Sequence, residues 1–382
     1  MSFALPYILL VGIYGGLGFW FEKTANPIVR RRLIAFSIGI FVFFFGFRGF
    51  CFYDWNSYYP VFQHYTLRDL FSLPVEDWPF EPGFTVLMLV SKSVFNNYHF
   101  FVFVCTLIDT VLLMRFLRRR VSNIPLALMV CISMNGLILF TDLMRNSITI
   151  LVFANAIELI ERRRLIPYIL VCIVSAAFHI SALFYIPLYF FIHRRLNKWI
   201  YLGIFAAGNI IFLFHIPVFL TLVGFVASFI SPALQYKISQ YTEMISGASF
   251  GLSIGYIERL FTGVIVFCYL NKLRNMREHN DIFINSLLLY LSLFFFFSEF
   301  KTIGLRFSNL FSYAYWIIWL DLIRCFAIEY NRRLYLAFIT LYCLFKMYGS
   351  TNTVIARYDN VLFGAEPYHI REYIYNKNYN DI

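Results

Sequence analysis

The sequence predicts an all-α, polytopic integral membrane protein. Hydrophobic residues make up 60% of its 382 residues and aromatic residues 21%, whereas charged residues make up only 14%. A soluble domain carries about 25% charged residues. Long apolar stretches recur along the chain, and the large basic clusters fall in every second gap between them. Because cytoplasmic loops carry the excess of Lys and Arg, this alternation predicts the orientation as well as the class.

Six basic clusters mark the gaps that we predict to be cytoplasmic. They are residues 30–32, 118–120, 162–164, 193–198, 272–277 and 324–333. The formal net charge of +11 comes largely from these clusters, and anionic lipid headgroups explain it. We expect no nucleic-acid partner, because the basic residues sit in short interhelical loops and form no continuous basic face.

About twelve crossings follow from windows of about 20 apolar residues, with both ends of the chain outside. In order, they lie near residues 3–21, 33–50, 98–117, 122–141, 145–160, 165–178, 180–193, 199–215, 255–270, 282–298, 305–324 and 334–348. We interpret the first as a retained helix, because no basic region precedes it and it contains no small-residue cleavage site.

Two further apolar pieces, residues 83–95 and 217–230, would place a basic cluster on the wrong side if they crossed. We therefore expect half-inserted or surface-lying helices on the outer face. The longest outer segments are then residues 48–97, residues 216–254 and the tail 349–382, which is rich in Tyr and Asn. The tail is expected to be wet and partly ordered.

No internal repeat or linker interrupts the chain, so a single polytopic domain over residues 1–382 is the simplest prediction. The seven cysteines are scattered singly, without Cys-x-x-Cys spacing. This pattern indicates neither a disulfide framework nor a metal site.

A second set of charged residues falls in the gaps that we predict to be outside: Arg48, Asp54, Glu81, Arg145, His179, Arg259 and Arg306. A charge in or near the hydrocarbon costs about 2.5–3.5 kcal/mol on insertion scales, so several on one side need a common explanation. A polar cavity that binds an anion at the outer leaflet provides one. The planar guanidinium fork suits phosphate oxygens, so four arginines from separate helices favour a diphosphate.

The outer motifs follow one another in a definite order. This order comprises Phe47-Arg48-Gly49 with Tyr53-Asp54 and Tyr58, then Glu81-Pro82-Gly83-Phe84, then Arg145 at the head of a helix, then Ala177-Phe178-His179-Ile180-Ser181-Ala182-Leu183, then Arg306-Phe307. In this order the chain resembles the EpsG-like branch of the Wzy-type polysaccharide polymerases. The resemblance runs from about residue 40 to about residue 315.

The resemblance implies a GT-C-like glycosyltransferase of bacterial exopolysaccharide, capsule or O-antigen biosynthesis. Such a multi-pass polymerase of the inner membrane has its active site facing the periplasm. It transfers a growing undecaprenyl-diphosphate-linked glycan onto a sugar hydroxyl of the next lipid-linked repeat unit. Its expected partners are that lipid-linked oligosaccharide, the bilayer, and a chain-length regulator and a flippase of the cell envelope.

The resemblance also implies roles for the outer residues. The leaving diphosphate would be bound by four arginines: Arg48, Arg145, Arg259 and Arg306. The base that takes the proton of the attacking hydroxyl would be Asp54, Glu81 or His179. We favour Asp54, because a carboxylate beside an arginine stays ionised at neutral pH, and place His179 second.

Simpler roles are open for each of these residues. Asp54 and Glu81 also suit helix caps, and His179 suits a neutral packing residue. Trp55 and Tyr58 are predicted to stack on sugar faces, although an interfacial aromatic belt accounts for them equally well. We expect no cofactor and no metal, since the outer loops contain no Asp-x-Asp pair.

Three other functions stay open. An O-antigen ligase also uses arginines against a lipid diphosphate, but its acceptor is a lipid A core. A membrane O-acyltransferase would use His179 and would leave the four arginines without a task. A flippase for lipid-linked glycans predicts charges that line a path from both faces, whereas most of these charges gather near one face.

Overall fold

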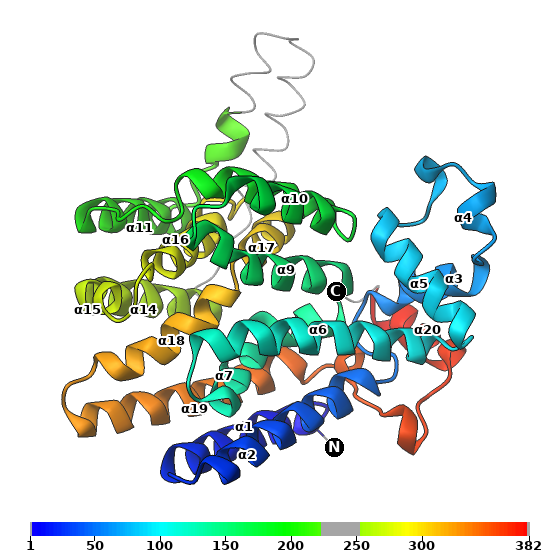
Figure 1. Ribbon diagram of the computed structural model, residues 1–382, viewed down its shortest axis with the longest axis horizontal. Coiled ribbons are helices and arrows are strands. Elements are labelled where there is room, and N and C mark those ends of the chain that lie inside the picture. The colour runs from blue at the N-terminus through cyan, green and yellow to red at the C-terminus, as the bar shows by residue number, and fades with distance from the viewer. Residues whose placement is uncertain (1, 223–252, 380–382) are drawn as a thin grey trace. The chain divides into compact units, whose positions relative to one another are not determined.

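The computed structural model describes residues 2–222 and 253–379, and within these ranges the regular secondary structure is helical (Figure 1). The only β pairing in the described chain is an isolated bridge between Arg48 and Asn360. The prediction of an all-α fold is therefore confirmed. The helices group into two compact units, Met1–Phe190 with Ala327–Ile382, and Phe191–Phe326. The prediction of a single domain stays a prediction.

In the first unit, long helices form the apolar layer. Helix α1 (Leu5–Lys23) packs against α7 (Ile124–Cys131) and α19 (Glu329–Thr351), and α6 (Tyr98–Arg120) packs against α9 (Met144–Glu161). These helices correspond to predicted crossings.

Three predicted crossings of this unit are irregular. Helix α2 (Pro27–Phe41) continues only as a π-helical turn, Val42–Gly46. A second π-helical segment, Ile132–Gly136, separates α7 from α8 (Leu137–Thr141) and contains Asn135 at a φ of 68°. After α10 (Leu165–Ala176), the chain forms a 3₁₀ helix, Ile180–Phe190 (η4), where we had predicted an ordinary membrane helix.

The segment between α2 and α6, which we predict to lie outside, forms short helices, as its polar composition suggests. They are α3 (Trp55–His64), α4 (Asp69–Ser72), a 3₁₀ turn (Val75–Asp77) and α5 (Pro82–Val94). Helix α5 is the predicted outer half-helix, and it begins at a proline, which a first helical position tolerates.

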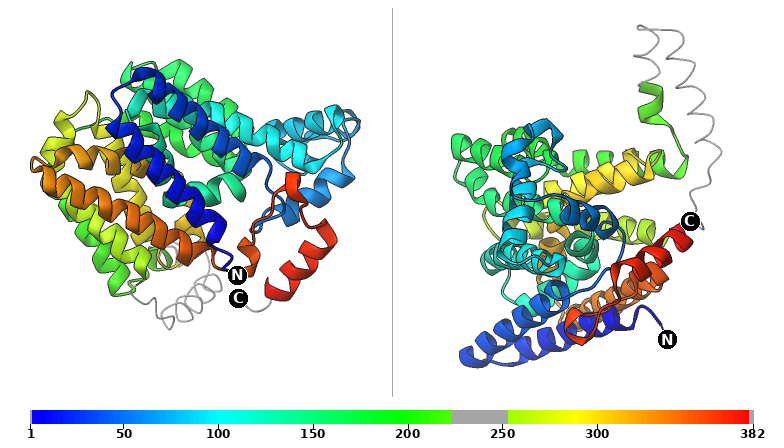
Figure 2. Two further views of the ribbon diagram at one scale, coloured as in Figure 1. Left: turned by 90° about the horizontal axis from the view of Figure 1, so that it is seen from below. Right: turned by 90° about the vertical axis from the view of Figure 1, so that its right-hand side faces the viewer.

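The C-terminal segment is ordered against this outer region. It contains the 3₁₀ turns Val354–Ala356 and Val361–Phe363 and the helix α20 (Tyr368–Tyr379). The amides of Gly49 and Phe52 donate to the carbonyls of Asp359 (2.9 Å) and Ile355 (3.0 Å). Figure 2 shows this red segment beside the blue segment that follows α2. A Cβ on Gly49 would lie 2.1 Å from Asp359 Oδ1, so this close approach requires glycine.

Buried ion pairs and ring contacts fix the same segment. Arg371 is buried and pairs with Asp359 and Glu366, at 3.1 Å each. Tyr368 stacks on Tyr59 of α3, with ring centroids 4.3 Å apart. The tail is thus more firmly packed than its composition predicts.

The described part of the second unit contains α11 (Lys198–Leu213), α14 (Ile254–Cys268), α15 (Leu270–Asn275), α16 (Asp281–Phe296), α17 (Lys301–Asn309) and α18 (Tyr313–Cys325). Helix α16 packs against α11, α17 and α18. The segment predicted to cross over residues 305–324 is not one continuous helix, because a turn at residues 310–312 separates α17 from α18. That it crosses the membrane stays a prediction. Most of the predicted segments 217–230 and 216–254 lies outside the described residues.

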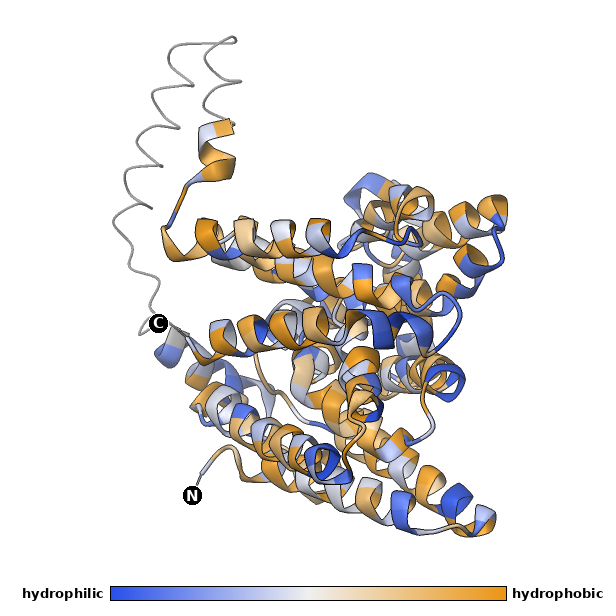
Figure 3. Ribbon diagram, turned by 90° about the vertical axis from the view of Figure 1, so that its left-hand side faces the viewer, coloured by the Kyte–Doolittle hydropathy of each residue, from blue (hydrophilic) through white to orange (hydrophobic). Residues whose placement is uncertain are grey.

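Three helical stretches of the described chain are long and apolar enough to cross a membrane: Leu5–Lys23, Tyr98–Arg120 and Ile124–Thr141. Five shorter apolar helices accompany them, among them α10, α11 and α16. Hydrophobic residues cover the helices, and hydrophilic residues gather at several connecting turns (Figure 3). A polytopic membrane protein is consistent with this pattern, while the number of about twelve crossings stays a prediction.

Candidate active site

Four of the residues singled out from the sequence meet in the first unit. Asp54 precedes α3, Glu81 precedes α5, Arg145 lies in the first turn of α9, and His179 lies in the turn between α10 and η4. Segments that are far apart in the sequence therefore bring two carboxylates, a guanidinium and an imidazole into one cluster.

Arg145 is the centre of this cluster. Its Nη1 donates to Glu81 Oε2 at 2.7 Å, and its Nε donates to the hydroxyl of Tyr58 at 3.3 Å. The guanidinium lies over the ring of Phe80, 4.9 Å from the centroid. A cation near a helix N-terminus is electrostatically unfavourable, so its acidic partner offsets an inherent cost. The side chain keeps 28% of its surface exposed and is accessible to a ligand.

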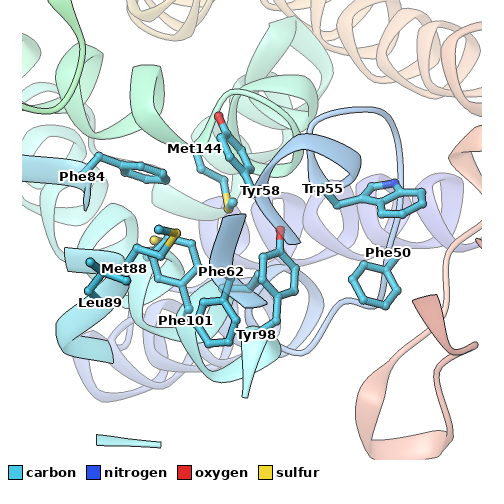
Figure 4. Close-up of a cluster of buried hydrophobic side chains, with 12 residues drawn as sticks. Phe50, Trp55, Tyr58, Phe62, Phe84, Met88, Leu89, Tyr98, Phe101 and Met144 are labelled. Carbon is cyan, nitrogen blue, oxygen red and sulfur yellow. The ribbon is translucent and has the colours of Figure 1, made fainter. Parts of the chain in front are cut away.

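Tyr58 connects Arg145 to Asp54. Its hydroxyl donates to Asp54 Oδ2 at 3.0 Å, while its ring is buried in an aromatic cluster with Phe62 and Phe84 (Figure 4). Burial, together with the neighbouring charge of Asp54, raises the pKa of Tyr58 far above its ordinary value. Tyr58 therefore stays protonated and remains a hydrogen-bond donor.

Glu81 joins the cluster to the turn after α10. Its Oε1 accepts the amide of Ile180 at 3.4 Å, and the amide of Gly83 donates to the carbonyl of Ala177 at 2.7 Å. Burial alone would raise the pKa of Glu81, but hydrogen bonds and the charge of Arg145 outweigh it and hold this pKa below its ordinary value. Glu81 is therefore ionised at neutral pH.

Neither carboxylate is a simple helix cap. The side chains of Asp54 and Glu81 make no capping hydrogen bond to α3 or α5, although both residues occupy the cap positions. A helix-capping hydrogen bond therefore does not account for either carboxylate.

His179 is anchored in its turn by Ser181. Its Nδ1 lies 2.8 Å from Ser181 Oγ and 3.1 Å from the amide nitrogen of Ser181, and Ser181 Oγ lies 3.0 Å from Asn146 Oδ1. The role of His179 as a base stays a prediction.

Asp142 is a further member that the sequence analysis did not single out. It lies in the turn between α8 and α9, only 6% exposed, and its Oδ1 accepts the amides of Tyr53 (2.7 Å) and Asp54 (2.9 Å). Burial, followed by the charge of Asp54, raises the pKa of Asp142 to about 7. An acidic residue three positions before Arg145 was the available signal.

Two predicted ligands are buried beside the cluster. Arg48 is 4% exposed and donates to the carbonyls of Phe45 and Thr141. Trp55 is 6% exposed and donates through Nε1 to the carbonyl of Phe52 at 3.0 Å. Both side chains are engaged with the protein itself, so neither presents an open face to a sugar or a diphosphate here.

The two remaining arginines belong to the second unit. Arg259 is buried in α14, where it donates to the carbonyl of Gly255 (2.7 Å) and the hydroxyl of Tyr290 (2.9 Å). Arg306 is exposed on α17. That they share one site with Arg145 stays a prediction.

Among residues 2–222 and 253–379, the structure brings together no group of three His, Cys, Asp or Glu side chains able to hold a metal ion.

The EpsG family matches residues 31–361, which is most of the chain. No curated protein matches the chain, and no solved structure matches it. The match supports a polysaccharide polymerase-like role at a membrane and confirms the resemblance inferred from the order of the motifs. The order of the sequence motifs and the family match over residues 31–361 agree, and the chain belongs to the EpsG family.

Proposed function

We propose that this protein polymerises a bacterial surface polysaccharide at the outer face of the inner membrane. It transfers a growing glycan from undecaprenyl diphosphate to a sugar hydroxyl of the next lipid-linked repeat unit. The observation that carries the proposal is the joined cluster of Arg145, Glu81, Tyr58 and Asp54, which places a cation for a diphosphate beside carboxylates for a hydroxyl.

The reaction requires one bond to form and one to break. The hydroxyl oxygen of the acceptor sugar bonds to the anomeric carbon of the donor, and the bond between that carbon and the diphosphate oxygen breaks. The diphosphate leaves with the electron pair, and the proton of the hydroxyl passes to a carboxylate. A preorganised cation at the leaving group and a positioned base are the two contributions that this chemistry needs.

Arg145 is assigned to the diphosphate because its side chain is partly exposed and lies at a helix N-terminus, where amides also attract anions. His179, in the turn next to Glu81, is retained as a further candidate base. An arriving diphosphate competes with Glu81 for Arg145, so the ion pair opens when the donor binds.

Asp54 remains the preferred base. Its carboxylate accepts from the neutral hydroxyl of Tyr58, whereas Glu81 is paired with the charge of Arg145 in the unliganded protein. Glu81 is the second candidate, since diphosphate binding would release it. Arg259 and Arg306 are retained as further diphosphate ligands, and Arg48 is reassigned to bracing the backbone.

The test is a polymerisation assay with purified protein in lipid nanodiscs and a synthetic undecaprenyl-diphosphate repeat unit. Native protein is expected to give a ladder of glycan lengths. Arg145→Lys keeps the charge but loses the planar fork, and Asp54→Asn removes the base. Each is expected to lower the rate by about 10²-fold or more, the usual cost of removing one stabilising group.

A matched control is Arg333→Lys, the same change in an exposed ion pair with Glu329 on α19. It is expected to retain the native rate, because exposed pairs contribute little. A native protein that moves the lipid-linked unit across the bilayer, acylates it or passes it to a lipid A core, without forming a ladder, would overturn the proposal.

A further inference from the structure

We infer that Asp142 is a positioning residue of the reaction, which holds Asp54 in register with Arg145. The inference rests on the proposed function, because it takes Asp54 and Arg145 as the groups that act on substrate. Its structural content, however, can be measured without any substrate.

The four residues form a closed ring. Asp142 Oδ1 accepts the amides of Tyr53 and Asp54, Asp54 Oδ2 accepts the hydroxyl of Tyr58, and Tyr58 accepts from Arg145 Nε. Arg145 follows Asp142 by three residues, so the chain closes the ring. Any shift of Asp142 is therefore transmitted to the base and to the cation together.

Asp142 binds the backbone immediately before α3. Its Oδ1 accepts the amides of Tyr53 and of the N-cap residue Asp54, and a carboxylate at this end also interacts favourably with the helix dipole. The side chain of Asp54 makes no capping bond to α3, and its Oδ2 accepts the hydroxyl of Tyr58.

The backbone ahead of Asp54 needs such a restraint. Phe52 has a φ of 64°, a left-handed conformation that costs a bulky residue about 1–3 kcal/mol and persists only when its surroundings fix it. Asp142 binds the two amides that follow Phe52, and Arg48 ties the preceding turn to the carbonyl of Thr141 at 3.3 Å. The turn between α8 and α9 is thus hydrogen-bonded to the chain both before and after Phe52.

The test compares two variants of similar size. Asp142→Asn keeps an oxygen that can accept both amides, whereas Asp142→Leu removes the acceptor and fills the same space. We expect Asp142→Asn to retain the native kcat within about threefold and Asp142→Leu to lower kcat by about 10- to 100-fold with little change in KM, as misplacement of a catalytic group does.

Amide hydrogen exchange of the folded variants in nanodiscs provides the readout that is independent of polymerisation. Exchange at Tyr53 and Asp54 is expected to accelerate at least tenfold in Asp142→Leu and to stay native in Asp142→Asn. A control is Asp69→Asn, which changes an exposed aspartate that accepts the amide of Thr66 outside the ring. It is expected to leave kcat and exchange at residues 53–54 unchanged.

Native kcat in Asp142→Leu, or equal loss of kcat in Asp142→Asn and Asp142→Leu, would overturn the positioning role. Unchanged exchange at residues 53–54 in Asp142→Leu would overturn it as well, even if the native protein forms no polymer. Failure of the proposed function would appear differently, as absence of a ladder from native protein while the exchange difference between the two variants persists.

Discussion

The carboxyl group of Asp142 binds the backbone amide of Asp54, so the two carboxyl groups lie close together and the charge of one affects the pKa of the other. The titratable and charged groups that face Asp142 are Asp54, Arg48 and Cys51. Burial and the charge of Asp54 together raise the pKa of Asp142, and the amides and Arg48 lower it only in part.

This coupling predicts a pH dependence of stability. The pKa of Asp142 is about 7 in the folded protein and about 3.9 in an unfolded chain, so the folded state binds the proton more tightly. The stabilisation is complete below about pH 4 and is lost as the pH rises through about 7. We expect the Tm of the native protein to fall more steeply than that of Asp142→Asn over this range. Parallel Tm curves for the two proteins would contradict the prediction.

Single residues were partly predictable from the sequence. Asp54, Glu81, Arg145 and His179 were recognised because charges in an apolar chain need an explanation. Asp142 was missed although it lies three positions before Arg145, because the backbone amides of Tyr53 and Asp54 that it binds are not recorded in the sequence. The contacts of His179 Nδ1 with Ser181 likewise depend on the local backbone and were not predictable.

At the scale of the elements, a lysine near the C-terminus of α5 joins this helix to the C-terminal end of α3. Lys92 of α5 donates to the carbonyls of Phe62 (2.6 Å), Gln63 (3.0 Å) and Tyr65 (2.7 Å) at the end of α3. Helix C-termini leave carbonyls without intrahelical partners, and a cation there satisfies them.

Lys92→Met keeps the length of this side chain and removes its three hydrogen bonds. We expect a loss of about 1.5–3 kcal/mol of stability, the range for hydrogen bonds to a charged group, and a lower Tm in the same detergent. Lys377→Met, on the exposed surface of α20, is the control and should leave the Tm unchanged. A native Tm for Lys92→Met would show that the three contacts contribute nothing.

A second prediction concerns the contact between Gly83 of α5 and Ala177 in the turn after α10. A Cβ on Gly83 would lie 2.9 Å from the carbonyl oxygen of Ala177, so Gly83→Ala should push the turn with His179 away. We expect lower polymer yield at an almost native Tm. Gly16→Ala in α1, where no atom lies within 4 Å of the new methyl group, should keep the native yield. Equal yields from the two variants would sink this prediction.

Elements were predictable where an apolar run is long and uniform. The broken elements were not, because hydropathy does not record the turn at which helical hydrogen bonding stops. The break at Met134 and Asn135 had a local signal, because Asn135-Gly136 is a typical turn pair, but the apolar residues on both sides of the pair outweighed it in the hydropathy window. Hydropathy likewise did not indicate the turn that separates α17 from α18 within the predicted crossing over residues 305–324.

At the scale of the whole molecule, the candidate site of the first unit depends on the C-terminal segment. Arg371→Met would leave Asp359 and Glu366 without their buried cation, and removing one partner of a buried pair costs about 3–5 kcal/mol. We expect a lower Tm and a reduced polymer yield. Arg332→Met, which breaks an exposed pair with Glu22, is the control and should change neither. The outcome against this prediction is an Arg371→Met protein with native Tm and yield.

The sequence indicated that the tail is polar but did not indicate how it packs. The tail is held by hydrogen bonds from the amides of Gly49 and Phe52 to its backbone carbonyls, and composition does not record such bonds. The assignment of Arg259 and Arg306 to one site with Arg145 came from the sequence alone. The structure describes these residues in two separate units.

The contact between the tail and the segment after α2 also bears on the order of folding during synthesis. Tyr358 donates to the carbonyl of Phe44, a residue 314 positions earlier in the chain. Because a chain folds from its N-terminus as it leaves the ribosome, this pairing cannot form before residue 358 has been made. A nascent chain shorter than this therefore holds the segment that leads to Asp54 without the support of the tail.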